Sequence, residues 1–409
     1  MHIRKLYRTI ENFATQPIEN VEELLKSVIH NIIISEDIEI KGGRLWKYNP
    51  KEHTYVLIHQ EGEVEKIRKN YQIKLKEYPL FYELTKSRTI IADEINKYLR
   101  KKGIKKFTAT GIGEKINVHG KKIYKYVLTF NSDDLSQNLI DTLNIISIAL
   151  TNVLKSKKIE QKAKQLQKDL DKASEIQKSI LPDQKLIFHN YEIFGISEPD
   201  QVVGGDFFDY LRSNDGDERL GIVIGDAASK GLSAAAQALY VSGAIRMGFE
   251  FQIKMNLLIS RINNLLNRVF HESNFVTLFY CEITNDKNGL IIYTNAGHNN
   301  PILYRPKTDE FEYLETTGQI LGPFPDEKYL TESTFLNKGD ILLLYTDGVI
   351  EARNEENIMF GENRLKEIIK ENKQKSAEDI ANTIMENIHN FEKPNNLSDD
   401  KTLVIIKRN

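Results

Sequence analysis

Three acidic motifs in the second half of the chain carry the side chains best suited to metal chemistry. They are Gly225-Asp226, Thr346-Asp347-Gly348 and Asp399-Asp400, and each lies at the polar end of an apolar, strand-like run. Strands that end in carboxylates can bring those carboxylates to one edge of a sheet. We therefore expect the three motifs to share a single site.

Carboxylates that are crowded together need a counter-charge. They repel one another and resist ionisation unless divalent cations neutralise them. Oxygen ligands with little His or Cys suit hard metals such as Mg²⁺ or Mn²⁺. The pattern predicts a hydrolytic centre with two metal ions.

The size and charge of the chain limit the classes of protein to which it can belong. Its 409 residues are too many for one ordinary domain, and about 100–200 residues per domain predicts two or three. The hydrophobic content of 40% and the charged content of 28% are ordinary for a soluble globular protein. Because the formal net charge is only −2, we expect no nucleic-acid partner.

Cysteine content and hydropathy bear on the cellular compartment of the protein. Cys281 is the only cysteine, which excludes a disulfide within one chain and a cysteine-rich zinc site. The basic segment from Met1 to Lys5 has no apolar segment behind it and does not predict a signal peptide. No apolar run approaches the roughly 18–20 residues of a membrane helix. We therefore expect a cytoplasmic protein without membrane insertion.

Residues 1–131 predict one domain of mixed helices and strands. Residues 21–34 carry apolar side chains at helical spacing. The order of the segments indicates an antiparallel sheet with helices on one face. The expected strands are residues 43–48 and 55–58, around an Asn49-Pro50 turn, and residues 107–114 and 124–130.

Residues 132–181 predict a long helix that connects the two halves of the chain. Asn131-Ser132 is typical of a helix N-cap. Ile159 and Leu166 belong to an apolar stripe at four-three spacing, and no proline or glycine interrupts the helix before Pro182. With lysines on its flanks, this surface suits a coiled coil between two copies of the chain. The alternative is a single amphipathic helix packed on its own domain.

Residues 182–409 predict an α+β domain. The strands are short and joined by turns, and the helices come in two pairs, so antiparallel sheets covered by helices are favoured over a doubly wound βαβ sheet. The expected strands are residues 191–196, 221–224, 275–283, 290–295, 301–305, 341–345 and 402–407, and the expected helices are residues 232–247, 256–270, 364–370 and 377–391.

Seven short motifs follow one another in order over residues 173–409. They are residues 173–182, Val203-Gly204-Gly205-Asp206-Phe207-Phe208-Asp209, residues 225–231, Ala296-Gly297-His298-Asn299-Asn300-Pro301, residues 321–326, residues 345–352 and Asp399-Asp400-Lys401-Thr402. Together they resemble the PPM-type metal-dependent serine/threonine phosphatases, specifically the SpoIIE/RsbU branch of bacteria. One such motif is weak evidence, whereas seven in order are highly specific.

The resemblance implies a fold and a chemistry for residues 182–409. The fold is an α-β-β-α sandwich of two antiparallel sheets flanked by helix pairs. The chemistry is hydrolysis of phosphoserine or phosphothreonine by a water that two Mn²⁺ or Mg²⁺ ions activate, with no covalent nucleophile. Asp226 would bridge both ions, with the Ala227 carbonyl as a further ligand, and Asp347 and Asp399 would complete the shell.

The resemblance leaves the roles of several neighbouring residues open. Asp400 competes with the adjacent Asp399 for its role, and Asp206 would act on a metal directly or through water. Asp209 is expected beside the ligands rather than on an ion. Lys230 is a candidate substitute for the phosphate-binding arginine of eukaryotic relatives. His298 is favoured as a structural loop residue over a general acid.

Two positions depart from the family pattern. Ser229 stands where a glycine is usual, and Asn300 stands where a second proline is common. Neither change removes a carboxylate from the expected metal site. Ser229 bears on how closely the loop that holds it approaches the substrate.

The resemblance also implies a role in bacterial signal transduction. The expected activity is a regulated phosphatase, and its expected substrate is a phosphorylated anti-sigma factor antagonist or a similar small STAS-domain protein. The alternative is a catalytically inactive module that binds phosphoproteins. Residues 1–131 are similar in layout to a GAF-type sensory domain with an unknown ligand or partner, and residues 132–181 would join a homodimer.

Overall fold

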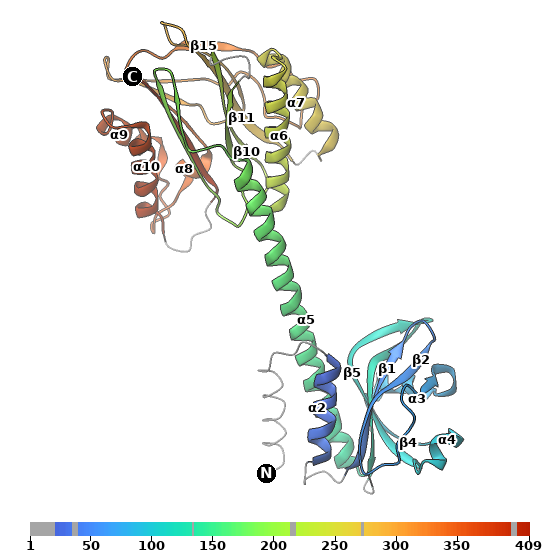
Figure 1. Ribbon diagram of the computed structural model, residues 1–409. Coiled ribbons are helices and arrows are strands. Elements are labelled where there is room, and N and C mark those ends of the chain that lie inside the picture. The colour runs from blue at the N-terminus through green and yellow to red at the C-terminus, as the bar shows by residue number, and fades with distance from the viewer. Residues whose placement is uncertain (1–20, 35–39, 133–134, 213–217, 271–273, 394–398) are drawn as a thin grey trace. The chain divides into compact units, whose positions relative to one another are not determined.

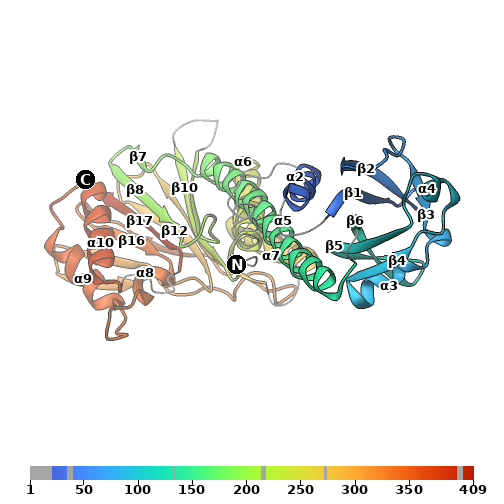
Figure 2. The same ribbon diagram turned by 90° about the horizontal axis from the view of Figure 1, so that it is seen from below.

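The computed structural model describes residues 21–34, 40–132, 135–212, 218–270, 274–393 and 399–409. The chain divides into two compact units, Met1–Gln165 and Leu166–Asn409 (Figures 1 and 2). Each unit has its own apolar core, so each is described separately.

The first unit is built on one six-stranded antiparallel sheet with the order β3-β2-β1-β6-β5-β4. Leu45 of β1 packs with α2 and the start of α5 on one face, and Trp46 packs with Phe81 of α3 on the other. Helices therefore cover both faces, not one as the sequence predicted, because both faces of the central strands are apolar. The elements are α2 (Val21–Ile34), β1 (Ile40–Asn49), β2 (Thr54–Gly62), β3 (Gln72–Lys74), η1 (Leu75–Glu77), α3 (Leu80–Ser87), β4 (Thr89–Asp93), α4 (Lys97–Lys101), β5 (Lys106–Val118) and β6 (Lys121–Ser132).

Helix α5 (Gln137–Ile180) begins in the first unit and continues into the second. It starts later than the sequence predicts, because the chain up to Ser132 still belongs to β6, where Ser132 pairs with Ile40 of β1. Leu143 and Leu150 are buried in the first unit, whereas Ile159 and Leu166 are about 60% exposed. This helix has the apolar stripe that the sequence predicted.

One stretch of α5 is apolar and long enough to cross a membrane by length and composition alone. The sequence analysis expected no such stretch. A single helix of this kind is weak evidence for a membrane span, and Leu143 and Leu150 are buried against the sheet of the first unit. Packing within the protein therefore accounts for part of this hydropathy.

The second unit is a sandwich of two antiparallel sheets, which we call the β10 sheet (β15-β12-β11-β10-β9) and the β17 sheet (β14-β13-β16-β17-β8-β7). Helices α6 and α7 pack on the outer face of the β10 sheet, and α8, α9 and α10 pack on that of the β17 sheet (Figure 1). The strands are β7 (Lys185–Phe188), β8 (Tyr191–Glu198), β9 (Phe207–Arg212), β10 (Arg219–Ala227), β11 (Val276–Thr284), β12 (Leu290–Ala296), β13 (Ile302–Arg305), β14 (Glu310–Tyr313), β15 (Glu332–Phe335), β16 (Ile341–Tyr345) and β17 (Lys401–Arg408), and the helices are α6 (Leu232–Glu250), α7 (Met255–Val269), α8 (Asp347–Glu351), α9 (Gly361–Glu371) and α10 (Ala377–Phe391).

Alternating side chains on the central strands hold the layers of the second unit together. Ile222 of β10 and Leu342 of β16 meet between the two sheets. The next residue on each strand, Val223 or Leu343, faces the helices that cover its own sheet. A strand buried on both faces must be apolar at successive positions, as these are. The prediction of antiparallel sheets covered by helix pairs is confirmed.

The sequence predicted seven strands of this unit and missed β7, β9, β14 and β15, together with the short helix α8. Strands β14 and β15 are short, largely exposed and rich in polar residues such as Glu310 and Ser333. Strand β9 begins directly after the Gly204-Gly205-Asp206 motif, in a segment for which the sequence had predicted no strand. This omission matters because β9 positions one of the acidic side chains.

Candidate metal centre

The pairing of β9 with β10 places Asp206 close to Asp226. Phe207, the first residue of β9, pairs with Gly225 of β10 in antiparallel register. The residue before β9 and the residue after Gly225 therefore lie at the same end of the β10 sheet. The negative charge of Asp226 acts on Asp206, and a side-chain hydrogen bond with Asp206 acts on Asp226.

The pairing of β16 with β17 brings together the other two acidic segments. Tyr345, the last residue of β16, pairs with Leu403 near the start of β17. Asp347 is the first residue of α8, and Asp399 lies just before β17. The charges of Asp347 and Asp399 both act on Asp226, so the two sheets bring their acidic ends together.

Asp206 is the most deeply buried of these carboxylates, with 4% of its surface exposed. Thr346 Oγ1 donates a hydrogen bond to Asp206 Oδ2 at 2.7 Å and accepts one from the backbone N–H of Thr402 at 3.0 Å. Burial raises the pKa of Asp206 well above its ordinary value, and the charge of Asp226 adds to the rise. Thr346 thus ties the β10 sheet to the β17 sheet at the acidic end.

The pKa values of Asp226 and Asp347 are raised by the same two causes. Burial is the larger cause for Asp226, followed by the charges of Asp347 and Asp399, and together they raise its pKa to about 7. Burial also raises the pKa of Asp347, with Asp399 and Glu351 as the next contributors. Burial and neighbouring carboxylates therefore both disfavour the ionised forms of Asp226 and Asp347.

Asp399 faces solvent and the other carboxylates. Its Oδ2 lies 3.2 Å from Nζ of Lys230, and both side chains are about half exposed. Lys230 also acts on Asp347, where its charge opposes the rise in pKa. The structure therefore places Lys230 at the acidic end of the sandwich.

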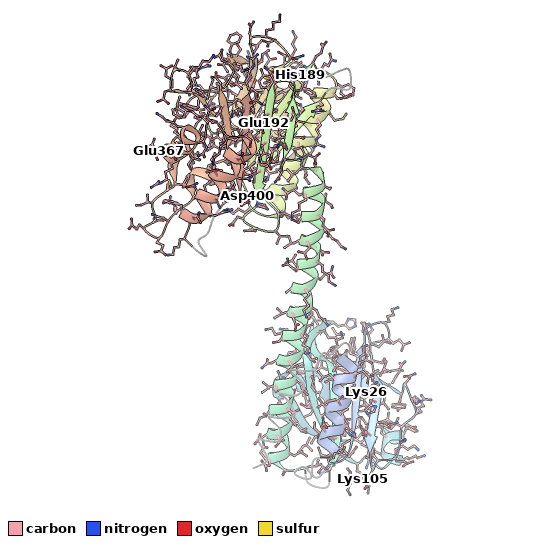
Figure 3. All side chains as sticks on the ribbon, turned by 60° about the vertical axis from the view of Figure 1, so that its left-hand side comes forward. Lys26, Lys105, His189, Glu192, Glu367 and Asp400 are labelled. Atoms are coloured by element: carbon pink, nitrogen blue, oxygen red, sulfur yellow. The ribbon has the colours of Figure 1, made fainter. Side chains whose placement is uncertain are left out.

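Asp400, labelled in Figure 3, binds backbone instead. Its Oδ1 accepts a hydrogen bond from the N–H of Asp200 at 2.8 Å, and its Oδ2 accepts from the N–H groups of Gly205 at 2.6 Å and Asp206 at 3.4 Å. A Cβ on Gly204 would lie 2.5 Å from the same Oδ2, so only glycine permits this approach. Asp400 therefore holds the turn that carries Asp206.

The carbonyl oxygen of Ala227 lies beside the same turn. A Cβ on Gly205 would stand 2.8 Å from this oxygen, and the N–H of Ser229 donates to it at 2.7 Å. A carbonyl has two lone pairs, so the Ala227 oxygen can accept one further interaction. The backbone at position 229 thus helps to orient the predicted carbonyl ligand, as a glycine there would also do.

The donor set fits hard divalent cations by its chemistry. It consists of carboxylate and carbonyl oxygens, the ligands that Mg²⁺ and Mn²⁺ prefer. Among the described residues, no three His, Cys, Asp or Glu side chains are gathered closely enough to hold one ion. The carboxylates therefore influence one another's pKa values, but they do not converge closely enough to surround a single ion. Mutual repulsion favours that spacing.

Asp209 is held away from the acidic end by an ion pair. Nε and Nη2 of Arg246 on α6 donate to its two carboxylate oxygens at 2.5 and 3.0 Å. The same Nη2 donates to the carbonyl of Ile180, the last residue of α5, at 2.7 Å. Arg246 therefore links Asp209 of β9 to the end of α5, and Asp209 is engaged in this ion pair rather than placed to bind an ion.

Gln177 of α5 contacts the Gly204-Gly205 turn directly. Its Nε2 donates to the carbonyl of Gly204 at 2.8 Å, and its Oε1 accepts from the N–H of Gly204 at 3.2 Å. The turn is thus fixed from one side by α5 and from the other by Asp400. Both contacts bear on the position of Asp206.

His298 is buried and serves the packing of the turn after β12. Its Nδ1 lies 2.9 Å from Thr277 Oγ1, and its backbone N–H donates to Asn295 Oδ1 at 2.8 Å. Burial lowers the pKa of His298 to about 4, so the ring is neutral near pH 7. A neutral ring with 3% exposure is poorly suited to act as a general acid.

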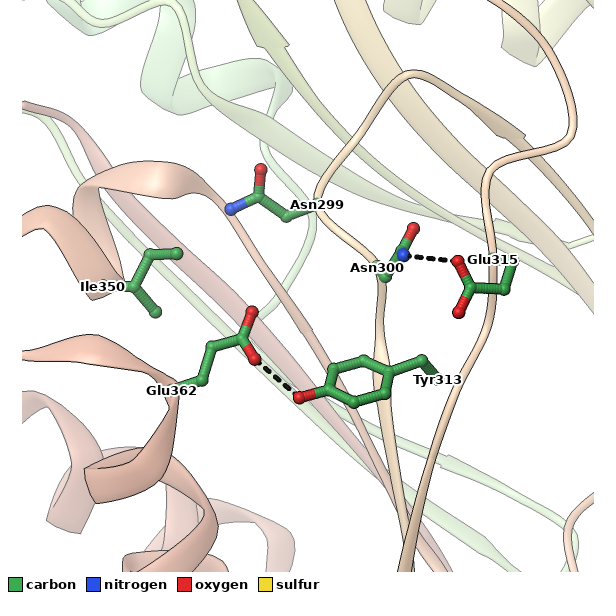
Figure 4. Close-up of a pocket in the computed structure, with 6 residues that line it drawn as sticks. All are labelled: Asn299, Asn300, Tyr313, Glu315, Ile350 and Glu362. Atoms are coloured by element: carbon green, nitrogen blue, oxygen red, sulfur yellow. Dashed lines mark hydrogen bonds between the residues drawn. The ribbon is translucent and has the colours of Figure 1, made fainter.

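An open pocket of about 450 Å³ lies beside the same turn (Figure 4). Glu315 accepts a hydrogen bond from Asn300 at 2.8 Å, and Glu362 accepts one from Tyr313 at 2.6 Å. None of the aspartates described above lines this pocket, and we do not assign the hydrolytic centre to it. The lining residues are Asn299, Asn300, Tyr313, Glu315, Ile350 and Glu362.

Three residues that position the acidic side chains were not predicted from the sequence: Thr346, Arg246 and Gln177. Thr346 and Gln177 lie inside two of the seven motifs, but a threonine and a glutamine are not metal ligands of the expected kind and were assigned no role. Arg246 lies near the end of α6, far from any motif, and nothing in the sequence singles it out.

Comparison with known proteins places the second unit in a family. Residues 216–409 match the family model described as Stage II sporulation protein E (SpoIIE). The phosphoserine phosphatase RsbU of Bacillus subtilis (strain 168) is 27% identical over 244 residues, which cover 60% of this chain and 71% of RsbU. The phosphoserine phosphatase RsbP of the same organism is 24% identical over 247 residues, which cover 58% of this chain and 57% of RsbP.

Solved structures support the fold. The SiaA-PP2C domain of Pseudomonas aeruginosa superposes with a TM-score of 0.52 at 20% identity, over 60% of this chain and 98% of that domain. At this identity, the likeness bears on the fold and not on the reaction.

Proposed function

Because residues 216–409 form a phosphatase domain of the SpoIIE family, we propose that the chain is a metal-dependent protein serine/threonine phosphatase. The names of RsbU and RsbP support this activity. One observation in this chain carries the proposal. Asp206 and Asp226 lie at one end of the β10 sheet, and Asp347 directly follows β16 of the β17 sheet. Burial together with neighbouring carboxylates raises the pKa values of all three.

The proposed ligands follow from the surroundings of each aspartate. Asp226 lies electrostatically between the acidic segments of both sheets and is the proposed bridging ligand. Asp347 and Asp399 complete the set, with Asp206 as a ligand either directly or through water. Asp400 accepts three backbone hydrogen bonds, so we assign it to positioning the Gly204-Gly205 turn rather than to the metal.

Two Mn²⁺ or Mg²⁺ ions at this place would activate water and neutralise charge on the phosphoryl group. The side chains of the protein provide the remaining functions. The carbonyl of Ala227 adds one more oxygen donor. Lys230, half exposed and paired with Asp399, is a candidate to contact a substrate phosphate once the negative charge of Asp399 is engaged elsewhere.

The proposed substrate is a small phosphoprotein of the STAS type that acts as an anti-sigma factor antagonist. This proposal rests on the likeness to RsbU and RsbP, because nothing in the second unit identifies a substrate by itself. We propose a cytoplasmic location on the same ground.

We further propose that α5 regulates the phosphatase. Near the end of α5, Gln177 contacts Gly204, which lies just before Asp206. Ile180 contacts Arg246, which binds Asp209 just after Asp206. The exposed stripe with Ile159 suits pairing with α5 of a second copy, and the first unit would act as a GAF-like sensory domain. A signal changes such an equilibrium only if it binds the two states with different affinity.

The test is phosphate release from phosphoserine proteins by the full chain. We expect activity that requires Mn²⁺ or Mg²⁺ and is lost in Asp226→Asn and Asp347→Asn, whereas Glu310→Gln, at an exposed position on β14, keeps it. Equal activity of the two aspartate variants and the native chain would refute the assignment of the site.

The competing proposal, a phosphoprotein-binding module without turnover, makes a different prediction. Such a module would bind a phosphorylated STAS protein but release no phosphate, and calorimetry would detect no Mn²⁺ binding that depends on Asp226. Metal binding without phosphate release from any phosphoprotein would support the metal site but overturn the proposed phosphatase activity.

A further inference from the structure

Arg44 in the first unit is a buried cation with too few partners. It lies on β1, in the middle of the sheet, and only 2% of its surface is exposed. Its Nη1 donates to Oδ1 of Asn131 at 2.5 Å, whereas its Nε and Nη2 have no hydrogen-bond partner. Buried donors are normally paired, because each unpaired group costs about 1–3 kcal/mol. The missing acceptors therefore need an explanation.

Glu94 balances part of this charge without pairing directly. Burial lowers the pKa of Arg44 to about 10, and the charge of Glu94 opposes that shift. The Oε1 of Glu94 is itself engaged, because it accepts hydrogen bonds from the hydroxyl of Tyr78 and from the N–H of Asn96. Within the described residues, Arg44 forms no ion pair.

The free edge of Arg44 borders a small cavity of about 20 Å³. A cavity of roughly 10–15 Å³ is enough for one water, so the space accepts a group only slightly larger. Apart from Arg44, Glu94 and Thr129, its walls are aromatic and aliphatic. They are formed by Trp46, Ile73, Tyr78, Phe81, Leu99, Ile104 and Phe107.

We propose that this cavity binds a monocarboxylate of formate size through the free edge of Arg44. Nε–H and one Nη2–H of a guanidinium point the same way, and their spacing matches the two oxygens of a carboxylate. The nearby negative charge of Glu94 disfavours a second negative charge, which excludes dicarboxylates and phosphates.

This inference does not depend on the proposed phosphatase activity. It gives the first unit a ligand of stated chemistry, whereas the GAF-like layout alone identifies none. It also explains why a guanidinium is retained in a core of apolar residues, where a methionine of similar length would cost less.

The single tryptophan provides the assay. Trp46 is the only tryptophan in the chain and lines the cavity, so its fluorescence reports on this site in the full-length protein. We expect a saturable change in emission with sodium formate. Sodium chloride at the same ionic strength and formamide, the neutral isostere of formate, should produce no saturable change.

Variants of two basic residues on β1 separate the site from a general effect. Arg44→Gln should abolish the response, and Arg44→Lys, which keeps the charge but loses the fork, should weaken binding at least tenfold. Lys41→Gln, at an exposed position on the same strand, should respond like the native chain.

Several outcomes would overturn the proposal. They are no saturable change in the native chain, an equal change with formamide, an equal change with chloride that indicates an adventitious ion only, or an unaltered response in a folded Arg44→Gln protein. The formate and formamide comparison needs no variant, so the proposal remains testable even if both Arg44 variants fail to fold.

Discussion

Replacing Asp226 by asparagine should stabilise the metal-free protein while removing metal binding. The pKa of Asp226 rises from 3.8 to about 7 in the folded chain. An acid with a raised folded pKa holds its proton more tightly when folded, so stability is highest below the unfolded pKa. That stability is lost as the pH rises through the folded pKa.

The magnitude follows from the same shift. A difference of about 3 pK units corresponds to roughly 4 kcal/mol between the low-pH and high-pH limits. Asp347 and Asp399 share the charge repulsion, so the relief expected in Asp226→Asn at pH 8 is about 2–4 kcal/mol. Near pH 4 the carboxyl group carries its proton and the gain should nearly vanish. With saturating Mn²⁺ the order should reverse, because only the native chain gains binding free energy.

Urea unfolding followed by circular dichroism at pH 5 and pH 8, in EDTA and in Mn²⁺, measures these differences. Trp46 fluorescence marks unfolding of the first unit, so the transition of the second unit can be identified separately. Glu310→Gln is the control for loss of an exposed carboxylate. The electrostatic reasoning fails if Asp226→Asn is less stable than the native chain in EDTA at pH 8, or if the difference is the same at both pH values.

Three further predictions concern other residues. Gln177→Ala should weaken Mn²⁺ binding up to about tenfold, because it removes two hydrogen bonds to the Gly204 backbone. Lys178→Ala is the control and should bind Mn²⁺ like the native chain. Equal titrations of the two variants would contradict this role of Gln177. Gly204→Ala should destabilise the second unit by about 1–3 kcal/mol, because the added Cβ would stand 2.5 Å from Asp400, and an unchanged urea midpoint would contradict the crowding. Burial raises the pKa of Cys281, so this thiol should resist thiol reagents at pH 8 until urea unfolds the second unit, and rapid labelling of the folded chain would show that the strand opens.

Much of the architecture of the second unit could be predicted because its central strands are apolar at successive positions. Residues 341–345 and 402–407 were expected as strands and form β16 and β17. Strand β9 carries no comparable signal, because its first residues belong to a motif that is recognised by its residue types and not by a periodic pattern. In the first unit, the helices on the second face of the sheet were missed because Trp46 and Leu45 are both apolar, and only packing shows that each faces a different layer.

The candidate site could be predicted in its residue types but not in its division of roles. Asp399 and Asp400 are neighbours in one motif, and sequence reasoning left both open as ligands. Their difference arises from which backbone lies nearby, since Asp400 meets the N–H groups of a turn nearly 200 residues away. Arg246 could not be assigned a role either, because its partner Asp209 lies on β9, a strand that was not predicted from the sequence.

The place of β17 in its sheet has a consequence for biosynthesis. This strand is formed by residues 401–408, yet it lies between β16 and β8 in the interior of the sheet. While a ribosome is still adding earlier residues, β8 and β16 have no neighbour to join them, and their edges stay open to other chains. The nascent second unit should therefore depend on chaperones until this last segment has emerged, and a translation product truncated before residue 401 should aggregate rather than fold.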